Sequence, residues 1–260
     1  MVSQYWKDRM AESLARISNK SIREIEKQMK KFYATAMKHT IAEFEAVYDK
    51  ILANKEEGKE PTANDLYQLD RYWKMQAQTR DELQKLGDKQ ISLLSKQFEE
   101  NFFEVYYSTL ADSTATFSTI DSAAVQQIIN QVWVADGKSW SRRIWGNIEQ
   151  LQETLSEGLM DCVVTGKKTS ELKEILQERF TVSYSNADML VRTEISHIQT
   201  EAAKKRYQDV GVQMVEIFAP HDERRCPQCR KLHGKKYMVG TPLPIPRHPR
   251  CRCTILPIIE

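Results

Sequence analysis

The sequence predicts a mainly α-helical protein with a long N-terminal helical hairpin and a small C-terminal α+β module. Residues that interrupt helices are rare in most of the chain, since only Gly58, Pro61 and Gly87 occur before residue 137. Seven of the eight prolines lie in the last 41 residues, from Pro220 onward. The hydrophobic period also changes near this point, from helical spacing to the alternation that is typical of strands.

The N-terminal part of the chain carries apolar side chains at helical spacing over residues 10–52 and again over 66–106. The stretch 54–61 between them is rich in Lys, Glu, Gly and Pro, so we expect a loop there. Thr62 is the expected N-cap of the second helix. Residues 1–110 should therefore form an antiparallel hairpin of two long amphipathic helices.

Two further segments follow the hairpin. Residues 111–122 are rich in Ser, Thr and Asp and are expected to be a loop, and 121–211 should consist of shorter helices that end near Gly137, Gly166 and Gly211. Residues 212–260 should form a β-rich module. The expected helices span 121–134, 139–164, 170–179 and 185–209, and the expected strands span 212–220, 236–239 and 254–258.

The net charge of +2 hides an uneven distribution. The first 220 residues hold 29 basic and 33 acidic side chains (−4), whereas residues 221–260 hold nine basic and three acidic ones (+6). Such a basic tail is either a solvated face or a surface for sequence-independent contact with DNA phosphates. We expect nonspecific binding of double-stranded DNA through nine side chains, which are Arg224, Arg225, Arg230, Lys231, Lys235, Lys236, Arg247, Arg250 and Arg252.

Four of the five cysteines cluster in this tail, as Cys226-x2-Cys229 and His248-x2-Cys251-x-Cys253. A C-x2-C turn directs two thiolates at one metal ion, and a second close pair can complete a tetrahedron. Zinc suits such a thiolate-rich set, and a site closed by four protein ligands is structural. Five candidates compete for four places, so either the four cysteines bind together or His248 replaces one of them. The predicted fold class is therefore mainly α with a small C-terminal α+β zinc-stabilised module.

Other interpretations of the cluster stay open. His221 and His233 are reserve ligands, two of the cysteines could form a disulfide, or the thiols could be unligated, although a cytoplasmic origin argues against a disulfide. Forty residues with six prolines after Pro220 bury too little apolar surface to order themselves, so zinc would supply the missing stability. We expect a strong chelator to unfold the tail and to leave the long helices intact. Cys162, outside the cluster, is expected to be a buried helix cysteine.

Signals of an enzyme are weak. The sequence has no Gly-x-Ser-x-Gly elbow, no phosphate-binding Gly-rich loop and no His-Glu-x-x-His. Glu194, His197 and Glu201 share one helix face, but no matching Glu/His helix occurs, so we interpret them as surface polar residues. A nuclease with a zinc-supported fold would need a further carboxylate and imidazole near a catalytic cation, for which only His221 and Asp222 are available. We therefore expect the chain not to be an enzyme.

Membrane signals are missing as well. No apolar run approaches the roughly 20 residues that a membrane-spanning helix needs. The first ten residues, MVSQYWKDRM, lack the apolar stretch of a secretory signal. We therefore expect no membrane association and a soluble chain that is made in a reducing cytoplasm.

The tail also carries a longer pattern, in which acidic residues precede CPQCRKLHGKKY (226–237) and PRHPRCRCTILP (246–257) follows. This pattern resembles the C-terminal signature of phage minor head proteins, the head-morphogenesis proteins related to the F protein of phage Mu. Their usual order is an acidic residue, a Cys or His pair, a Leu-x-Gly step and a final His-Pro-x-Cys-Arg-Cys before a short apolar strand. Upstream, the helix that carries Arg192, Thr193 and Glu194 is similar to the family's Arg-Thr-Glu helix, and the role of this motif is unknown. The resemblance covers about residues 120–257.

The resemblance implies a phage minor capsid (head morphogenesis) protein. Such a virion component is made in the host bacterial cytoplasm, associates with the portal protein during procapsid assembly, lies inside the head near the portal and contacts or helps to deliver DNA. Capsid or scaffolding proteins, and further copies of this chain through the long helices, are additional expected partners. Family members often carry extra C-terminal domains, including toxin-like enzymes, and none is expected here. The alternative function is a zinc-supported DNA-binding protein or nuclease of a mobile element.

Overall fold

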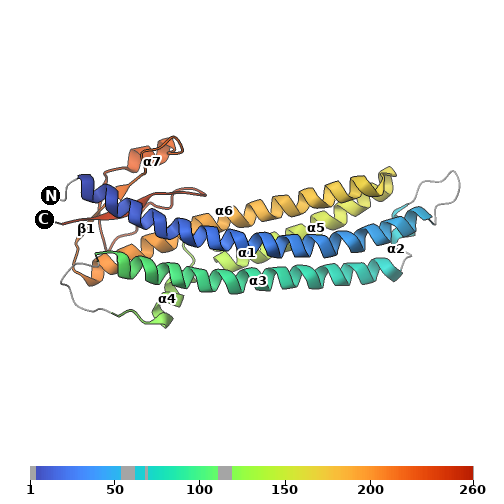
Figure 1. Cartoon of the computed structure of the whole chain (residues 1–260), viewed down its shortest axis with the longest axis horizontal. Helices are drawn as coiled ribbons and strands as arrows, with labels where there is room; N and C mark the ends of the chain where they lie inside the picture. Colours follow the sequence, from blue (N-terminus) through green and yellow to red (C-terminus); the bar gives the residue numbers. More distant parts are fainter. Residues whose placement is uncertain (1–3, 54–61, 68–69, 111–118, 260) are drawn as a thin grey trace. The chain divides into compact units, whose positions relative to one another are not determined.

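The computed structural model describes residues 4–53, 62–67, 70–110 and 119–259, which are mainly helical and end in a small sheet (Figure 1). The predicted mainly α class with a small C-terminal α+β part is thereby confirmed. None of the described helices has a stretch that is long and apolar enough to cross a membrane. The elements are α1 (Gln4–Ala53), α2 (Ala63–Tyr67), α3 (Asp70–Ser108), α4 (Ser122–Ile129), α5 (Trp140–Thr165), α6 (Thr169–Asp209), β1 (Met214–Phe218), α7 (Pro227–Leu232), β2 (Lys236–Met238) and β3 (Thr254–Ile258).

Several element ends agree with the signals in the sequence. α2 begins directly after Thr62, and β3 coincides with the strand expected at 254–258. Gly166 follows α5 with φ +66°, and Gly211 follows α6 with φ +79°, a left-handed conformation that glycine adopts without steric cost. The loop expected at 54–61 lies outside the described residues, and so does the 111–118 part of the loop expected at 111–122; of the remainder, 119–121 is non-helical as expected and Ser122 already begins α4.

The clearest difference from the sequence-based expectation is α6. We predicted two helices, 170–179 and 185–209, whereas the structure has one helix of 41 residues. Residues 180–184 contain neither Gly nor Pro. Ser183 is also buried there, and its hydroxyl oxygen accepts a hydrogen bond from Nδ2 of Asn147 at 3.0 Å. Tertiary packing therefore keeps the backbone helical where the local apolar pattern becomes irregular.

The chain forms two compact units, and each is built from separate segments of the sequence. Unit 1 consists of Met1–Glu26, Leu93–Trp140 and Met189–Glu260. Unit 2 consists of Lys27–Ser92 and Ser141–Asp188. The helices α1, α3 and α6 contribute to both units, so neither unit corresponds to one continuous stretch of chain.

Unit 2 is a bundle of α1, α3, α5 and α6 segments. Tyr48 on α1 is fully buried and its hydroxyl donates to the carbonyl of Cys162 on α5 at 2.9 Å. Cys162 is itself fully buried, as expected, and burial raises the pKa of its thiol. Gly87 on α3 lies so close to the indole of Trp145 on α5 that a Cβ atom would overlap the ring. Close approach of these two helices thus depends on glycine.

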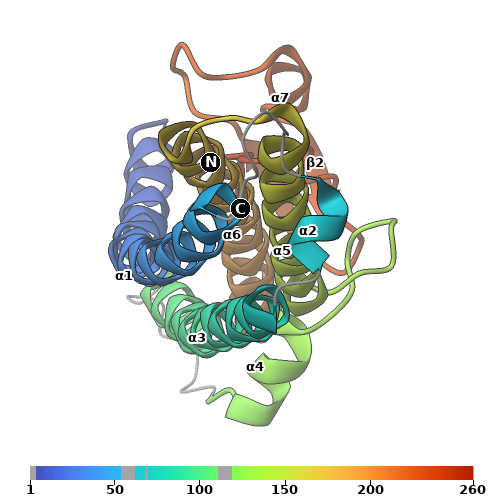
Figure 2. The same cartoon turned by 90° about the vertical axis from the view of Figure 1, so that its right-hand side faces the viewer.

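Unit 1 contains the sheet and the cysteine-rich tail. The strand order is β2-β1-β3, and both neighbours of β1 are antiparallel to it, with Val215 opposite Tyr237 and Ile217 opposite Ile255. Helix α4 lies beside α3, because Gln126 Nε2 donates to a carboxylate oxygen of Glu99 at 2.9 Å (Figure 2).

Helix α6 forms the centre of unit 1. Seven consecutive residues, Glu194–Thr200, are buried, so this part of the helix is covered on all sides. Gln199 donates to Oγ1 of Thr254 at the start of β3 at 3.0 Å, and the Tyr207 hydroxyl donates to the carbonyl of Ile255 at 3.3 Å. The cysteine-rich tail is thus fixed to the core of unit 1 by polar side chains of α6.

Candidate metal centre

The first pair of candidate ligands lies at the N-terminus of α7. Cys226 is the N-cap of this short helix, and its Sγ accepts a hydrogen bond from the backbone N–H of Cys229 at 3.3 Å. Pro227 occupies the first turn, where its fixed φ suits the helix and no N–H is needed. The Cys-Pro-x-Cys sequence therefore folds into a cap that brings both thiols to one side, with Cys229 buried and Cys226 partly exposed.

The second pair of candidate ligands, His248 and Cys251, lies on a tight turn with the related sequence His-Pro-x-Cys. The backbone N–H of Cys251 donates to the carbonyl of His248 at 3.1 Å, which closes the turn. Arg250, inside the turn, has φ +59°, a left-handed conformation that is unfavourable for a residue with a Cβ atom. Nδ1 of His248 lies 2.8 Å from the carbonyl oxygen of Pro249, so Nδ1 carries the proton and donates it there. Nε2 is then left as the nitrogen with a free lone pair, the arrangement found in metal-binding histidines.

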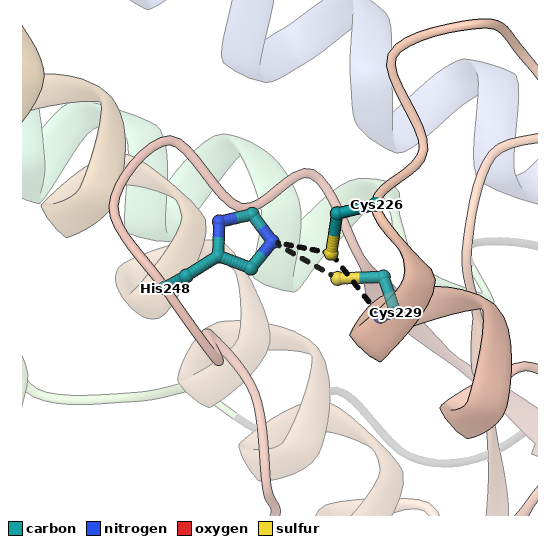
Figure 3. A group of neighbouring side chains, drawn as sticks. All are labelled: Cys226, Cys229 and His248. Carbon is teal, nitrogen blue, oxygen red and sulfur yellow. Dashed lines mark hydrogen bonds between the residues drawn. The ribbon is translucent and has the colours of Figure 1, made fainter.

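The two turns bring their side chains together (Figure 3). Nε2 of His248 lies 3.2 Å from Sγ of Cys226 and 3.1 Å from Sγ of Cys229, and Sγ of Cys229 lies 3.8 Å from Sγ of Cys251. A tetrahedral zinc ion with Zn–S bonds of about 2.3 Å holds two sulfur ligands about 3.8 Å apart, and a sulfur and a nitrogen about 3.5 Å apart. The spacing and chemistry of these side chains therefore fit a metal ion.

Five donors surround this position, in two overlapping triads. Cys226, Cys229 and His248 form one triad, and Cys229, Cys251 and Cys253 form the other, with the ligand atoms of each within 4.8 Å of one another. Cys229 belongs to both triads and lies at the centre of the cluster. None of the five cysteines, all of which are described, forms a disulfide in the structure.

The thiols of the second triad differ in acidity. A hydrogen bond with Cys253 lowers the pKa of Cys251 to about 5, and the hydrogen bond with Cys251 raises the pKa of Cys253 above its ordinary value. The lowered pKa of Cys251 favours its thiolate form. A thiolate is the form in which cysteine binds metals.

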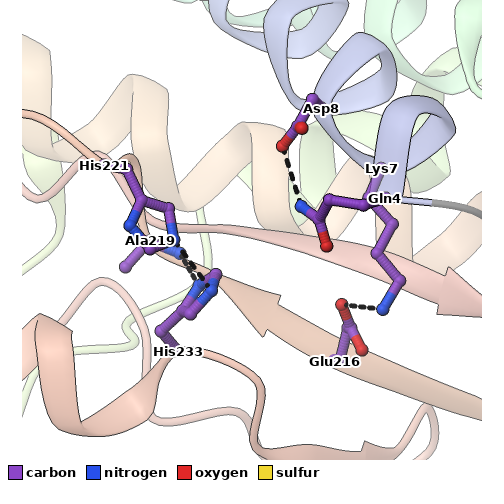
Figure 4. A network of polar contacts seen from close by, with 7 residues as sticks. All are labelled: Gln4, Lys7, Asp8, Glu216, Ala219, His221 and His233. Atoms are coloured by element: carbon purple, nitrogen blue, oxygen red, sulfur yellow. Dashed lines mark hydrogen bonds and ion pairs between the residues drawn. The ribbon is translucent and has the colours of Figure 1, made fainter.

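The two reserve histidines belong to neither triad. They contact each other instead (Figure 4). Nε2 of His221 lies 3.0 Å from Nε2 of His233, and the backbone N–H of Ala219 donates to Nδ1 of His233 at 3.2 Å. Because Nδ1 of His233 accepts a hydrogen bond, its proton is on Nε2, which donates to His221. In this arrangement His233 has no lone pair on Nε2 to offer a metal ion.

Polar contacts also define which basic side chains of the tail are accessible. Eight of the nine candidate DNA contacts are exposed, and Arg225 is half-buried. Arg252 forms a bidentate ion pair with Asp222 at 2.5 and 2.6 Å, and this guanidinium lowers the pKa of the carboxyl to about 2. Asp222, the carboxylate considered for a nuclease, is therefore occupied by Arg252.

The Arg-Thr-Glu motif on α6 faces three different segments of unit 1. Arg192 forms an ion pair with Glu26 on α1, and a carboxylate oxygen of Glu194 accepts a hydrogen bond from Nε1 of Trp133 at 3.0 Å. Thr193 contacts the second ligand turn, because its Oγ1 accepts a hydrogen bond from the backbone N–H of Arg250 at 3.0 Å. Sequence reasoning missed this contact, since no local pattern links residues 57 positions apart.

The interpretation of Glu194 and His197 as surface residues is wrong. Their exposed fractions are 2% and 7%, because the Trp133 indole covers both of them. The ring of His197 stacks on Trp133 with centroids 4.3 Å apart and an interplanar angle of 15°. Glu201 is half-buried. The sequence predicts Trp133 within a helix over 121–134, whereas α4 ends at Ile129 and Trp133 lies in the loop before α5. Nothing in the sequence shows which residues this side chain covers.

Comparison with known proteins connects these features to a family. Residues 153–256 match the family described as phage Mu protein F like protein, and this range contains the Arg-Thr-Glu motif and all five donors of the cluster. The predicted phage Mu F-like recognition is confirmed. The matched range is about two fifths of the chain and begins later than the residue 120 that the sequence suggested. The similarity is therefore shown for this C-terminal part of the chain.

A relative outside the phage Mu F-like description was also found. The chain is 22% identical over 186 residues to an NAD(+)–arginine ADP-ribosyltransferase EFV of Enterococcus faecalis, and the alignment covers 64% of this chain. The chain spans only 38% of the length of that relative. No solved structure matches the chain.

Proposed function

We propose that the protein is a phage minor capsid protein that acts by binding, as a component of the virion near the portal. The observation that carries this proposal is the phage Mu F-like match over residues 153–256, which contains the whole cysteine-histidine cluster. The partner that follows is the portal protein, with capsid or scaffolding proteins as further candidates. The protein would be made in the host bacterial cytoplasm and incorporated during procapsid assembly.

The test is co-purification with a portal ring. The protein is co-expressed with the portal protein of the same phage, and complexes are separated by size. A stable complex supports the proposal, and complete separation at micromolar concentrations contradicts it. A charge-reversed variant of the tail, Arg230→Glu with Lys231→Glu, weakens contact with DNA phosphates, so a portal complex that persists in this variant is not bridged by DNA.

The cluster is proposed to bind one structural zinc ion through Cys226, Cys229, His248 and Cys251. Cys251 is chosen as the fourth ligand because its Sγ lies 3.8 Å from that of Cys229 and because it completes the His-Pro-x-Cys turn, the counterpart of the Cys-Pro-x-Cys turn. Cys253 then acts as a hydrogen-bond donor to the thiolates and not as a ligand. When bound, zinc would cross-link the two turns and supply stability that the small tail lacks.

Metal analysis of the purified protein tests the ligand set, with about one zinc per chain expected. Cys229→Ser should abolish zinc binding, because Cys229 is shared by both triads, whereas Cys253→Ser should keep the stoichiometry. Loss of zinc in both variants would contradict the assignment of Cys253. Chelation should reduce order in the tail while the helical circular dichroism persists, and an unchanged tail would refute a structural role.

Nonspecific DNA binding is proposed for the exposed basic side chains of the tail, without catalysis. The engagement of Asp222 by Arg252 and of His221 by His233 supports a binding role, because both candidate catalytic groups already have partners. Binding to a plasmid should weaken steeply with salt. A nicking assay with added Mg²⁺ or Mn²⁺ addresses the nuclease alternative: cleavage that is lost in His221→Ala would overturn the non-enzymatic proposal.

A further inference from the structure

The hydroxyl of Thr193 is held in one orientation. It donates to the carbonyl of Met189, one turn earlier on α6, at 2.7 Å. Its proton is therefore used within the helix, and a lone pair on Oγ1 remains for the N–H of Arg250, 3.0 Å away. Thr193 thus presents a fixed acceptor to the tail, on a part of α6 that is buried immediately afterwards, from Glu194 to Thr200.

The Thr193 oxygen bonds to the backbone of Arg250, whose conformation is unfavourable. Arg250 has φ +59°, and a residue with a Cβ atom adopts this conformation only when its surroundings hold it there. Arg250 lies between His248 and Cys251, so its backbone sets the distance between these two side chains. The bond from Cys251 N–H to the His248 carbonyl closes the turn from within, and the Thr193 bond fixes it from outside.

We infer that Thr193 is a positioning residue for the metal centre, which holds the His248–Cys251 turn in its left-handed conformation through the N–H of Arg250. The inference rests on the metal site of the proposed function and gives the middle residue of the Arg-Thr-Glu motif a role. Arg192 and Glu194 fix the same turn of α6 to Glu26 and Trp133, so the acceptor is held by contacts on both sides.

The test is a zinc titration of the full chain in competition with a chromogenic chelator. Thr193→Val keeps the shape of the side chain but removes the acceptor, and should weaken zinc binding about tenfold, at the lower end of effects from residues behind metal ligands. Thr193→Ser keeps the hydroxyl and should stay within about twofold of the wild type. Thr181→Val is the matched control, since Thr181 is an exposed residue of α6 whose hydroxyl makes the same bond to the carbonyl four residues earlier, Gln177, at 2.9 Å.

A second cycle distinguishes positioning from a general loss of stability. Glycine adopts positive φ freely, so Arg250→Gly should form the turn without help. The tenfold penalty of Thr193→Val should therefore shrink to about twofold in the Arg250→Gly background, while a merely structural role would leave it unchanged. If Thr193→Val does not fold, Thr193→Ala is compared with Thr193→Ser in the same two backgrounds.

The outcomes separate the inference from the proposal beneath it. Equal zinc affinity of the wild type and Thr193→Val, or an equal penalty in both backgrounds, overturns the positioning role while the metal site stands. Zinc binding that persists in Cys229→Ser shows that the metal site itself is misassigned. A penalty that Thr193→Ser does not rescue would also overturn the inference, because it would not depend on the hydroxyl.

Discussion

Acid should destabilise this protein through one buried side chain, His197. Its imidazole is 7% exposed and stacks on Trp133, and its Nε2 has no hydrogen-bond partner among the described residues. Burial lowers the pKa of His197 from its ordinary 6.5 to about 4, since the charged form would have no water around it. The folded protein therefore resists a proton that the unfolded chain accepts.

The sign and size of the effect follow from these two values. Above pH 6.5 the side chain is neutral in both states and its full contribution to stability is present. As the pH falls from 6.5 to about 4, the free energy of unfolding should fall by about 1.4 kcal/mol per pH unit, or about 3 kcal/mol in total. Below about pH 4 the folded form is protonated too, and the loss levels off.

Urea unfolding at a series of pH values, followed by circular dichroism, measures this loss. His197→Phe keeps an aromatic ring against Trp133 but cannot titrate, so the difference between wild type and variant isolates the histidine from other acid effects, including loss of metal. Parallel pH profiles for wild type and His197→Phe would refute the reasoning.

Three more results are expected. Gly87→Ala places a methyl group against the Trp145 ring and should lower the free energy of unfolding, measured in urea, by about 1–3 kcal/mol. Gly146→Ala is the control, because no atom lies within 4 Å of the added methyl group, and it should raise the free energy of unfolding by about 0.5–1 kcal/mol. Equal effects would contradict the packing argument. Tyr48→Phe removes the hydroxyl of a fully buried side chain, which donates to the carbonyls of Cys162 and Lys167. The free energy of unfolding should fall by about 1–2 kcal/mol. An unchanged value would mean that these hydrogen bonds do not stabilise the protein. Arg230→Ala should reduce the salt dependence of DNA binding by about one phosphate contact. Arg252→Ala should change the salt dependence less, because the guanidinium of Arg252 is already paired with Asp222. The reverse order would show that Arg252 leaves Asp222 to contact DNA.

The helical architecture was predictable because it depends on local properties. Scarce Gly and Pro and the apolar period are sufficient for long helices such as α1 and α3, and alternation is sufficient for β3. The cysteine-histidine cluster was also predictable, because ligand spacing in the sequence reflects the geometry of two turns. The sequence left the choice among five donors open, and the structure adds the 3.8 Å distance between the sulfur atoms of Cys229 and Cys251 on which the proposed ligand set rests.

The rest depends on contacts between distant segments. Ser183 gives no sign in the sequence that it will be buried, so the continuity of α6 was missed. The burial of Glu194 and His197 arises from Trp133, about 60 residues earlier, and the role of Thr193 depends on the backbone of Arg250. Polar residues lie mostly at the surface. Those that are buried have partners in distant segments of the chain, and the hydrophobic period of the sequence does not identify these partners.

The bonds from α6 to the tail limit how the protein can be divided. Thr193, Gln199 and Tyr207 contact Arg250, Thr254 and Ile255, so side chains of α6 hold both the His248–Cys251 turn and β3. A fragment that begins at residue 212 would keep every candidate ligand but would expose Ile255 and Leu256, which are fully buried in the protein. The cysteine-rich tail therefore cannot be moved to another protein alone. A fragment that keeps its metal-binding geometry would have to include the second half of α6.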